Sequence, residues 1–183
     1  MNLQVRASLY YGFLNAAGCF FFSLILYFAG KNPLGTWGWL GVWIPIVFMV
    51  AGVRAHRDID LGGAINYSHA FATSFLVALS GAIMFCILIY LFGILVGTNI
   101  TSMMISESAE KIEKAKSDLD KDLYDKAKHS LEEMKLSPSY TLFRMVLGEI
   151  TIRSLCGFLF SLIVAGFMKK DIALSADPDH DQD

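Results

Sequence analysis

Residues 70–97, with the sequence AFATSFLVALSGAIMFCILIYLFGILVG, contain no charged side chain. A helix needs about 20 consecutive apolar residues to cross the hydrocarbon layer of a bilayer, which is roughly 30 Å thick. This stretch is long enough, so we predict that it crosses a membrane. The fold then depends on how many other stretches of the chain share this property.

Two further spans are predicted before it. Residues 7–30 carry no charge and stop at Lys31, which is followed by Asn32 and Pro33. Residues 34–53 open with three tryptophans at positions 37, 39 and 43, a residue type enriched where a helix meets the membrane surface. Pro45 lies within this second span, where we expect it to kink the helix.

A fourth span is predicted at residues 147–168, ending at Lys169-Lys170. It is less uniform than the others, because Glu149 and Arg153 lie near its beginning. We therefore predict an all-α fold, namely an integral membrane bundle of four helices at about residues 7–30, 34–53, 70–97 and 147–168.

The composition agrees with a membrane protein. Of the 183 residues, 55% are hydrophobic and 17% are charged, whereas an ordinary soluble domain is about 25% charged. Half of the 32 charged residues lie between Glu107 and Lys135. The net charge of −2 gives no basic excess of the kind that binds phosphate backbones, so nucleic acid is not an expected partner.

Small residues recur at every fourth position on three of the predicted spans. In lipid, two apolar helices gain no hydrophobic free energy by pairing, and small residues allow the close backbone contact that holds them together. We therefore predict that these stripes are packing faces: Ser8, Gly12 and Ala16 in the first span, Ser74, Ala78 and Ala82 in the third, and Gly157, Ser161 and Ala165 in the fourth.

Residues 98–137 form a charged extramembrane segment between the third and fourth spans. Apolar residues recur there in steps of three and four, which predicts an amphipathic helix. Ile112, Leu119 and Leu123 share one face, and we predict that this face docks on a partner. A single helix from Ser106 to Leu136 would extend about 45 Å, so the segment either lies along the membrane or breaks into a hairpin, with Ser117-Asp118 as the plausible break.

The ends of the chain differ in charge. Residues 171–183 form an acidic tail, which carries four aspartates after Ser175 and is expected to be disordered.

Basic residues indicate the orientation in the membrane. They flank the spans on the side of both termini at positions 6, 54, 57, 169 and 170, whereas Lys31 and Arg144 flank them on the other side. The positive-inside rule therefore predicts cytoplasmic termini, although the lysines of the charged segment, farther from the membrane, argue the other way.

The chain resembles a small family of membrane proteins known as domain-of-unknown-function family 4199. The resemblance covers nearly the whole chain and rests on Tyr11-Gly12, on the stretch GGAINYSHAF at residues 62–71, on the charged segment and on Lys169-Lys170. It implies a four-span protein of the bacterial inner (cytoplasmic) membrane. It brings no known activity, cofactor or catalytic residue.

Three residues within the predicted spans carry an amide, a carboxylate or a guanidinium group, and such residues within a span are candidates for function. Asn15 is expected to form an interhelical hydrogen bond, with contact to a transported substrate as the alternative. Glu149 and Arg153 are four residues apart and predict an ion pair near the membrane surface, with a functional site as the alternative. The histidines and the three cysteines show no metal or cofactor spacing.

These features favour two functions over an enzyme. The first is an accessory or scaffolding subunit that docks on other membrane proteins, or on itself, through the charged segment. The second is a small oligomeric transporter or channel with Asn15, Glu149 and Arg153 along its path. A lipid-binding protein is a third, weaker expectation.

Overall fold

The computed structural model describes residues 3–117 and 120–169 and is helical throughout these ranges. Its helices are α1 (Leu3–Phe28), α2 (Trp43–Ala55), α3 (Tyr67–Leu95), α4 (Asn99–Lys114), α5 (Lys121–Leu136) and α6 (Pro138–Met168). A 3-10 helix, η1 (Thr36–Gly41), precedes α2, and a π-helical turn, η2 (His56–Asp60), follows it.

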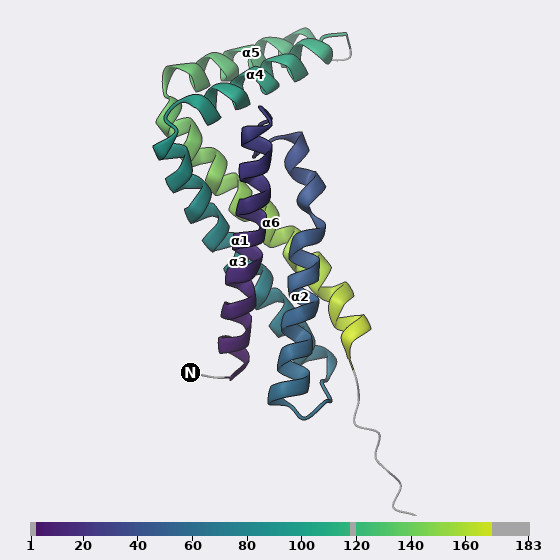
Figure 1. Cartoon of the computed structure of the whole chain (residues 1–183). Coiled ribbons are helices and arrows are strands. Elements are labelled where there is room, and N and C mark those ends of the chain that lie inside the picture. Colours follow the sequence, from purple (N-terminus) through teal and green to yellow (C-terminus); the bar gives the residue numbers. More distant parts are fainter. Residues whose placement is uncertain (1–2, 118–119, 170–183) are drawn as a thin grey trace, which may run out of the picture.

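Four helical stretches are long and apolar enough to cross a membrane: α1, the continuous stretch Thr36–Asp60, α3, and residues Tyr140–Met168 of α6. The predicted all-α, four-span class is therefore confirmed. Helix α3 packs against both α1 and α6, and α2 closes the bundle. The beginning of α1, the connection from α2 to α3 and the end of α6 lie at one end of the bundle, and α4 and α5 lie across the other (Figure 1).

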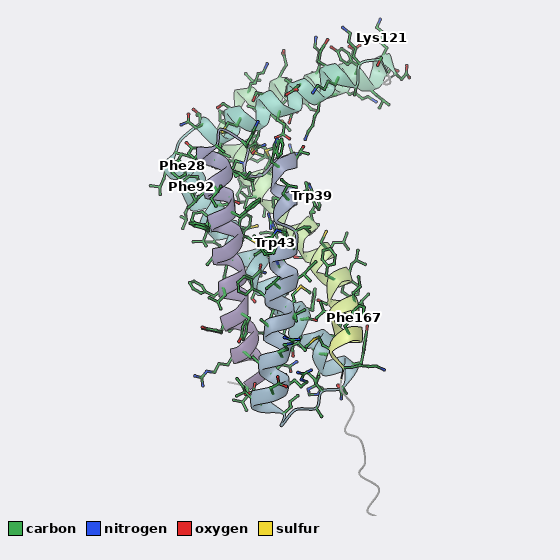
Figure 2. All side chains as sticks on the ribbon, turned by 45° about the vertical axis from the view of Figure 1, so that its right-hand side comes forward. Phe28, Trp39, Trp43, Phe92, Lys121 and Phe167 are labelled. Carbon is green, nitrogen blue, oxygen red and sulfur yellow. The ribbon has the colours of Figure 1, made fainter. Side chains whose placement is uncertain are left out.

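The outer surface of the bundle is apolar, as a lipid-facing surface should be. Figure 2 shows Phe28, Trp39, Trp43 and Phe167 on the outside of the spans, and between 56% and 85% of each of these residues is exposed. In water these exposed side chains would be unfavourable, since burying one is worth about 1.5 to 3 kcal/mol. Their arrangement around the four spans fits a surrounding bilayer.

All nine residues of the predicted small-residue stripes are buried. A side chain at Gly12 would meet the hydroxyl of Ser80 and, at 3.2 Å, the backbone nitrogen of Gly81 in α3. Between α6 and α3, a Cβ atom at Gly157 would lie 2.7 Å from the Cβ of Ala78. The absence of side-chain bulk therefore lets α1 and α6 approach α3 closely.

The structure changes two of the expected helix boundaries. Pro45 is the third residue of α2, in the first turn, where its missing N–H is not needed. It therefore begins a helix after the η1 turn instead of kinking a long one. Pro138 likewise occupies the first turn of α6, a position for which its fixed φ is suited, so α6 starts nine residues before the predicted Leu147.

The third span begins at a well-defined cap. The side chain of Asn66 accepts a hydrogen bond of 2.9 Å from the backbone N–H of His69, which makes it the N-cap of α3. Gly62 and Gly63 have φ values of +68° and +99°, so they turn the chain from η2 into this helix. The stretch that carries the family resemblance is therefore a glycine turn followed by a helix cap.

The charged segment is a hairpin, the second of the two arrangements that its length allows. Helix α4 ends at Lys114, and α5 begins at Lys121 after an N-cap at Asp120. Ile100 and Met104, at the base of α4, are buried in one cluster with Leu142 and Val146 of α6. The base of the hairpin thus belongs to the bundle core, while Lys121 lies at its far end (Figure 2).

The predicted docking face is only partly described. Ile112 is half-buried on α4, and 54% of Leu123 is exposed on α5. Leu119 and the acidic tail at 171–183 lie outside the described residues. Because the segment folds back on itself, α5 covers part of α4, and the apolar positions do not form one continuous stripe.

The contact between α3 and α6 yields a first prediction. Gly157→Ala should lower the free energy of unfolding by about 1 to 3 kcal/mol, the usual effect of overpacking a close contact, because the Cβ of Ala78 has no freedom to move away. Gly166→Ala, on the same helix with nothing within 4 Å of a new Cβ, is the control. Thermal melting in mild detergent measures both variants, and equal melting points would mean that the two helices do not meet at Gly157.

Candidate functional site

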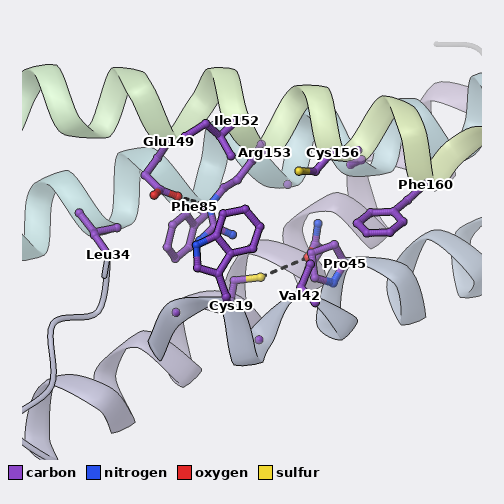
Figure 3. Close-up of a pocket in the computed structure, with 18 of the residues that line it drawn as sticks. Cys19, Leu34, Val42, Pro45, Phe85, Glu149, Ile152, Arg153, Cys156 and Phe160 are labelled. Carbon is purple, nitrogen blue, oxygen red and sulfur yellow. Dashed lines mark hydrogen bonds and ion pairs between the residues drawn. The ribbon is translucent and has the colours of Figure 1, made fainter. Parts of the chain in front are cut away.

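The three polar residues singled out within the spans line one cavity. Asn15 comes from α1, and Glu149 and Arg153 come from α6; the cavity between them has a volume of about 80 Å³ (Figure 3). A water molecule needs on the order of 10 to 15 Å³ measured in this way, so the space can hold several waters or part of a small ligand. Chain positions more than 130 residues apart thus contribute to one polar site.

Glu149 and Arg153 form an ion pair at the floor of the cavity. The Nε of Arg153 donates to Oε2 of Glu149 over 2.9 Å, and about a quarter of each side chain is exposed. The guanidinium carbon of Arg153 lies 4.0 Å from the ring centroid of Phe85 in α3, a favourable cation–π contact. The pair lies in the middle third of α6, deeper in the helix than expected from a span that began at residue 147.

Asn15 lies beside this pair, near the middle of α1. Its Oδ1 accepts a hydrogen bond of 3.5 Å from the thiol of Cys19, one turn further along the same helix. Its amide nitrogen is directed at Gly81 of α3, where a side chain would collide with it. The contact between the two helices is therefore a steric fit of Asn15 against Gly81.

Small residues also create the cavity. Ala78, Gly81 and Ala82 of α3 line it together with Gly157 of α6. The first and last of these belong to the contact that brings the two helices together, as the 2.7 Å approach at Gly157 shows. The lack of side-chain bulk therefore has two effects: it lets α3 and α6 pack closely at Gly157, and it leaves an open space beside that contact.

The rim of the cavity is apolar. Trp39 contributes from η1, Val42 from the junction of η1 with α2, and Ile152 and Phe160 from α6. More than a third of the surface of Trp39, Val42 and Ile152 is exposed, and Figure 2 shows Trp39 on the outside of the spans. Both sides of this rim belong to candidate spans, so the cavity opens sideways, toward the region occupied by lipid.

The connection from α1 to η1 forms another wall, through Pro33, Leu34, Gly35 and Gly38. It is held by Glu107 of α4. Asn32 Nδ2 donates to this carboxylate over 2.8 Å, and both the backbone N–H and the hydroxyl of Thr36 donate to it, over 3.0 and 2.8 Å. Lys111 adds an ion pair of 2.8 Å. We call this set of contacts the Glu107 clamp.

The clamp changes the acidity of Glu107. Burial acts to raise the pKa of this carboxyl, but the hydrogen bonds from Lys111, Thr36 and Asn32 outweigh it and lower the pKa to about 2. Since a carboxyl in the unfolded chain has a pKa near 4.5, the ionised form is stabilised by folding. The clamp therefore ties the charged hairpin to the wall of the cavity through an ionised group.

Sequence reasoning found the polar residues of the cavity, because ionisable and amide side chains are rare within spans. It missed the wall at residues 33–45 and the clamp. The pair Glu107/Lys111 was visible as an acid four residues before a base, but nothing in its spacing connects it to Asn32. Cys19 and Cys156 also line the cavity, and no metal-ligating group of three His, Cys, Asp or Glu side chains occurs among the described residues.

Comparison with known proteins identifies one family. A family model described as "Protein of unknown function (DUF4199)" matches residues 10–170, which is most of the chain. No curated protein and no solved structure matches. The matched region contains most of the first span, the other three spans, the charged hairpin and every residue of the cavity.

The Glu107 clamp yields a second prediction. Glu107→Gln should lower the free energy of unfolding by about 1 to 3 kcal/mol at pH 7, since it removes the charge from several hydrogen bonds. Because the pKa of Glu107 is depressed in the folded state, its stabilisation is full above pH 4.5 and is lost as the pH falls toward 2. The difference in melting temperature from wild type should shrink over that interval.

Glu110→Gln is the matched control, since Glu110 pairs with Lys114 on the exposed face of the same helix. It should leave the melting temperature nearly unchanged. A Glu107→Gln variant as stable as Glu110→Gln would show that the clamp does not hold the hairpin.

Proposed function

Because the chain belongs to the DUF4199 family, whose description carries no activity, we propose from its geometry that it is a membrane-embedded binding protein. Its ligand is a small molecule held in the cavity lined by Asn15, Glu149 and Arg153. This proposal develops the transporter alternative of the sequence analysis, because binding within the bundle is the first step of transport.

One observation carries the proposal, namely that the amide of Asn15 and the charged groups of Glu149 and Arg153 meet at one cavity. Charged groups within a membrane are costly and are typical of ligand or ion pathways. A purely structural ion pair would be expected in a filled interface, without a cavity beside it. Here about a quarter of each charged side chain remains exposed, which leaves hydrogen-bonding capacity for a ligand.

The proposed location is the bacterial inner membrane, with both termini in the cytoplasm and the hairpin of α4 and α5 in the periplasm. The support is the distribution of basic residues: Arg6, Arg54 and Lys169 lie at one end of the bundle. Positive charge near the ends of the spans favours the cytoplasmic side.

Closing the cavity should abolish ligand retention. Ile152→Trp places an indole at the rim. The amount of a small molecule that remains bound to the purified wild-type protein should fall at least about tenfold in this variant, which corresponds to about 1.4 kcal/mol of binding free energy. Leu155→Trp is the control, since Leu155 lies on the same helix, 61% exposed, and does not line the cavity. Mass spectrometry of extracts from the purified proteins makes the comparison, and equal retention by both variants would refute the proposal.

The accessory or scaffolding role remains a second candidate, because Leu123 is 54% exposed on the extramembrane helix α5. Burial of such a side chain is worth about 1.5 to 3 kcal/mol. The proposed partner is the extramembrane surface of another membrane protein.

One substitution tests both this role and the proposed orientation. In a chain whose native cysteines are replaced, Leu123→Cys should react with a membrane-impermeant thiol reagent from outside spheroplasts. A crosslinker attached there should capture one stoichiometric protein, whereas Asp125→Cys, 200° around the same helix at 100° per residue, should not. Labelling only after the membrane is opened contradicts the orientation, and equal capture from both sites contradicts the docking role.

A further inference from the structure

We propose that the ligand is a neutral amphiphile, which has an uncharged polar head on an apolar chain and reaches the cavity from the hydrocarbon layer between η1 and α6. This inference rests on the proposed function, because it concerns the same cavity. It adds the chemical class of the ligand, and it follows from the charge, the hydrogen-bonding capacity and the position of the lining residues.

The charge of the cavity comes first. Of the described residues that line it, Glu149 is the one acid and Arg153 the one base, and they neutralise each other. Glu107, which lies against the lining residue Gly35, is itself paired with Lys111. The site therefore has no net charge to offer. An ionic ligand would leave one buried charge without a partner, which costs several kcal/mol in a medium of low dielectric constant.

The hydrogen-bonding capacity comes second. A guanidinium has five donor hydrogens and a carboxylate has about four acceptor positions. The ion pair between Glu149 and Arg153 is made through Nε and Oε2, and both side chains remain partly exposed at the cavity. A head group that accepts from Arg153 and donates to Glu149, as a hydroxyl or a primary amide does, satisfies both residues without adding charge.

The route into the cavity comes third. Trp39 and Val42 come from one candidate span and Ile152 and Phe160 from another, and these largely apolar side chains line the cavity where the two spans face each other; Val42, Ile152 and Phe160 are labelled in Figure 3. A water-soluble ion would meet no charged group among these four side chains. A molecule already dissolved in the bilayer can insert its head toward Arg153 while its chain stays between η1 and α6. An amphiphile matches a lining that has charged groups at Glu149 and Arg153 and apolar side chains between η1 and α6.

The native cysteines provide the measurement. Cys156 lines the cavity and is partly exposed, whereas Cys86 is 99% buried and does not line it. The wild-type protein is placed in vesicles of phosphatidylcholine and treated with benzyl methanethiosulfonate, an uncharged thiol reagent. Peptide mass spectrometry then gives the modification rate at each cysteine. Slower modification of Cys156 reports occupancy, and an unmodified Cys86 reports an intact fold.

Three probes with the same chain are compared over the same series of mole fractions in the bilayer: 1-dodecanol, which is neutral, dodecanesulfonate, which is permanently negative, and dodecyltrimethylammonium, which is permanently positive. Dodecanol should protect Cys156 at a mole fraction at least about tenfold lower than either ion, because neither ion can be neutralised in the site.

Two substitutions should invert this preference. Glu149→Gln leaves the cavity with a net positive charge, so dodecanesulfonate should become the best protector. Arg153→Gln leaves a net negative charge, so dodecyltrimethylammonium should become the best. Each variant is accepted only if Cys86 remains unmodified, and either one alone is sufficient, so failure of one variant to fold leaves the test intact.

The outcomes separate the two proposals. The neutral ligand would be overturned if an ion protected Cys156 of the wild type better than dodecanol does, or if all three probes protected it equally. It would also be overturned if the order of the three probes were the same in the variants as in the wild type. Each of these results would leave the binding cavity itself supported. If no probe slows modification of Cys156 in the wild type, the cavity does not take amphiphiles, and this inference is overturned. The proposed function would then be decided separately, by whether Ile152→Trp loses a bound molecule that Leu155→Trp retains.

Discussion

The structure depends on the close approach of α1 and α6 to α3. No hydrophobic gain drives two apolar helices together within lipid, so their packing rests on contact between backbones and small side chains. Gly12 and Gly81 give this contact between α1 and α3, and Ala78 and Gly157 give it between α3 and α6. Larger side chains at these positions would separate the helices, and the cavity between them would lose its walls.

The same contact explains how an ion pair is tolerated inside the bundle. Arg153 is tied to Glu149 and lies against the ring of Phe85. Each partner reduces the cost of holding the other away from water. Their exposed quarter faces a space that the small residues of α3 leave open. The pair of Glu149 and Arg153, which has no net charge, can therefore be stable within the bundle and still have groups available to recognise a ligand.

Much of this architecture was predictable from residue patterns. The number of spans follows from uncharged stretches, the packing faces from small residues every fourth position, and the polar residues of the cavity from their rarity in spans. The kink expected at Pro45 was wrong, because this proline lies in the first turn of α2, and the fourth helix extends beyond the predicted span because Pro138 is suited to its first turn. The meeting of Asn15 with Glu149, and of Glu107 with Asn32, could not be predicted. These contacts join distant positions through the tertiary arrangement, for which one sequence carries no periodic signal.

The Glu107 clamp makes the hairpin and the cavity wall parts of one mechanical unit. Asn32 and Thr36 hold the carboxylate on either side of Pro33, Leu34 and Gly35, which line the cavity. Coupling of this kind is reciprocal: a ligand that favours the clamped position of this wall would raise the affinity of the hairpin for a partner that also favours it, and that partner would raise the affinity of the cavity for the ligand by the same factor. Under the proposed function, the clamp would therefore link binding in the cavity to binding at the hairpin.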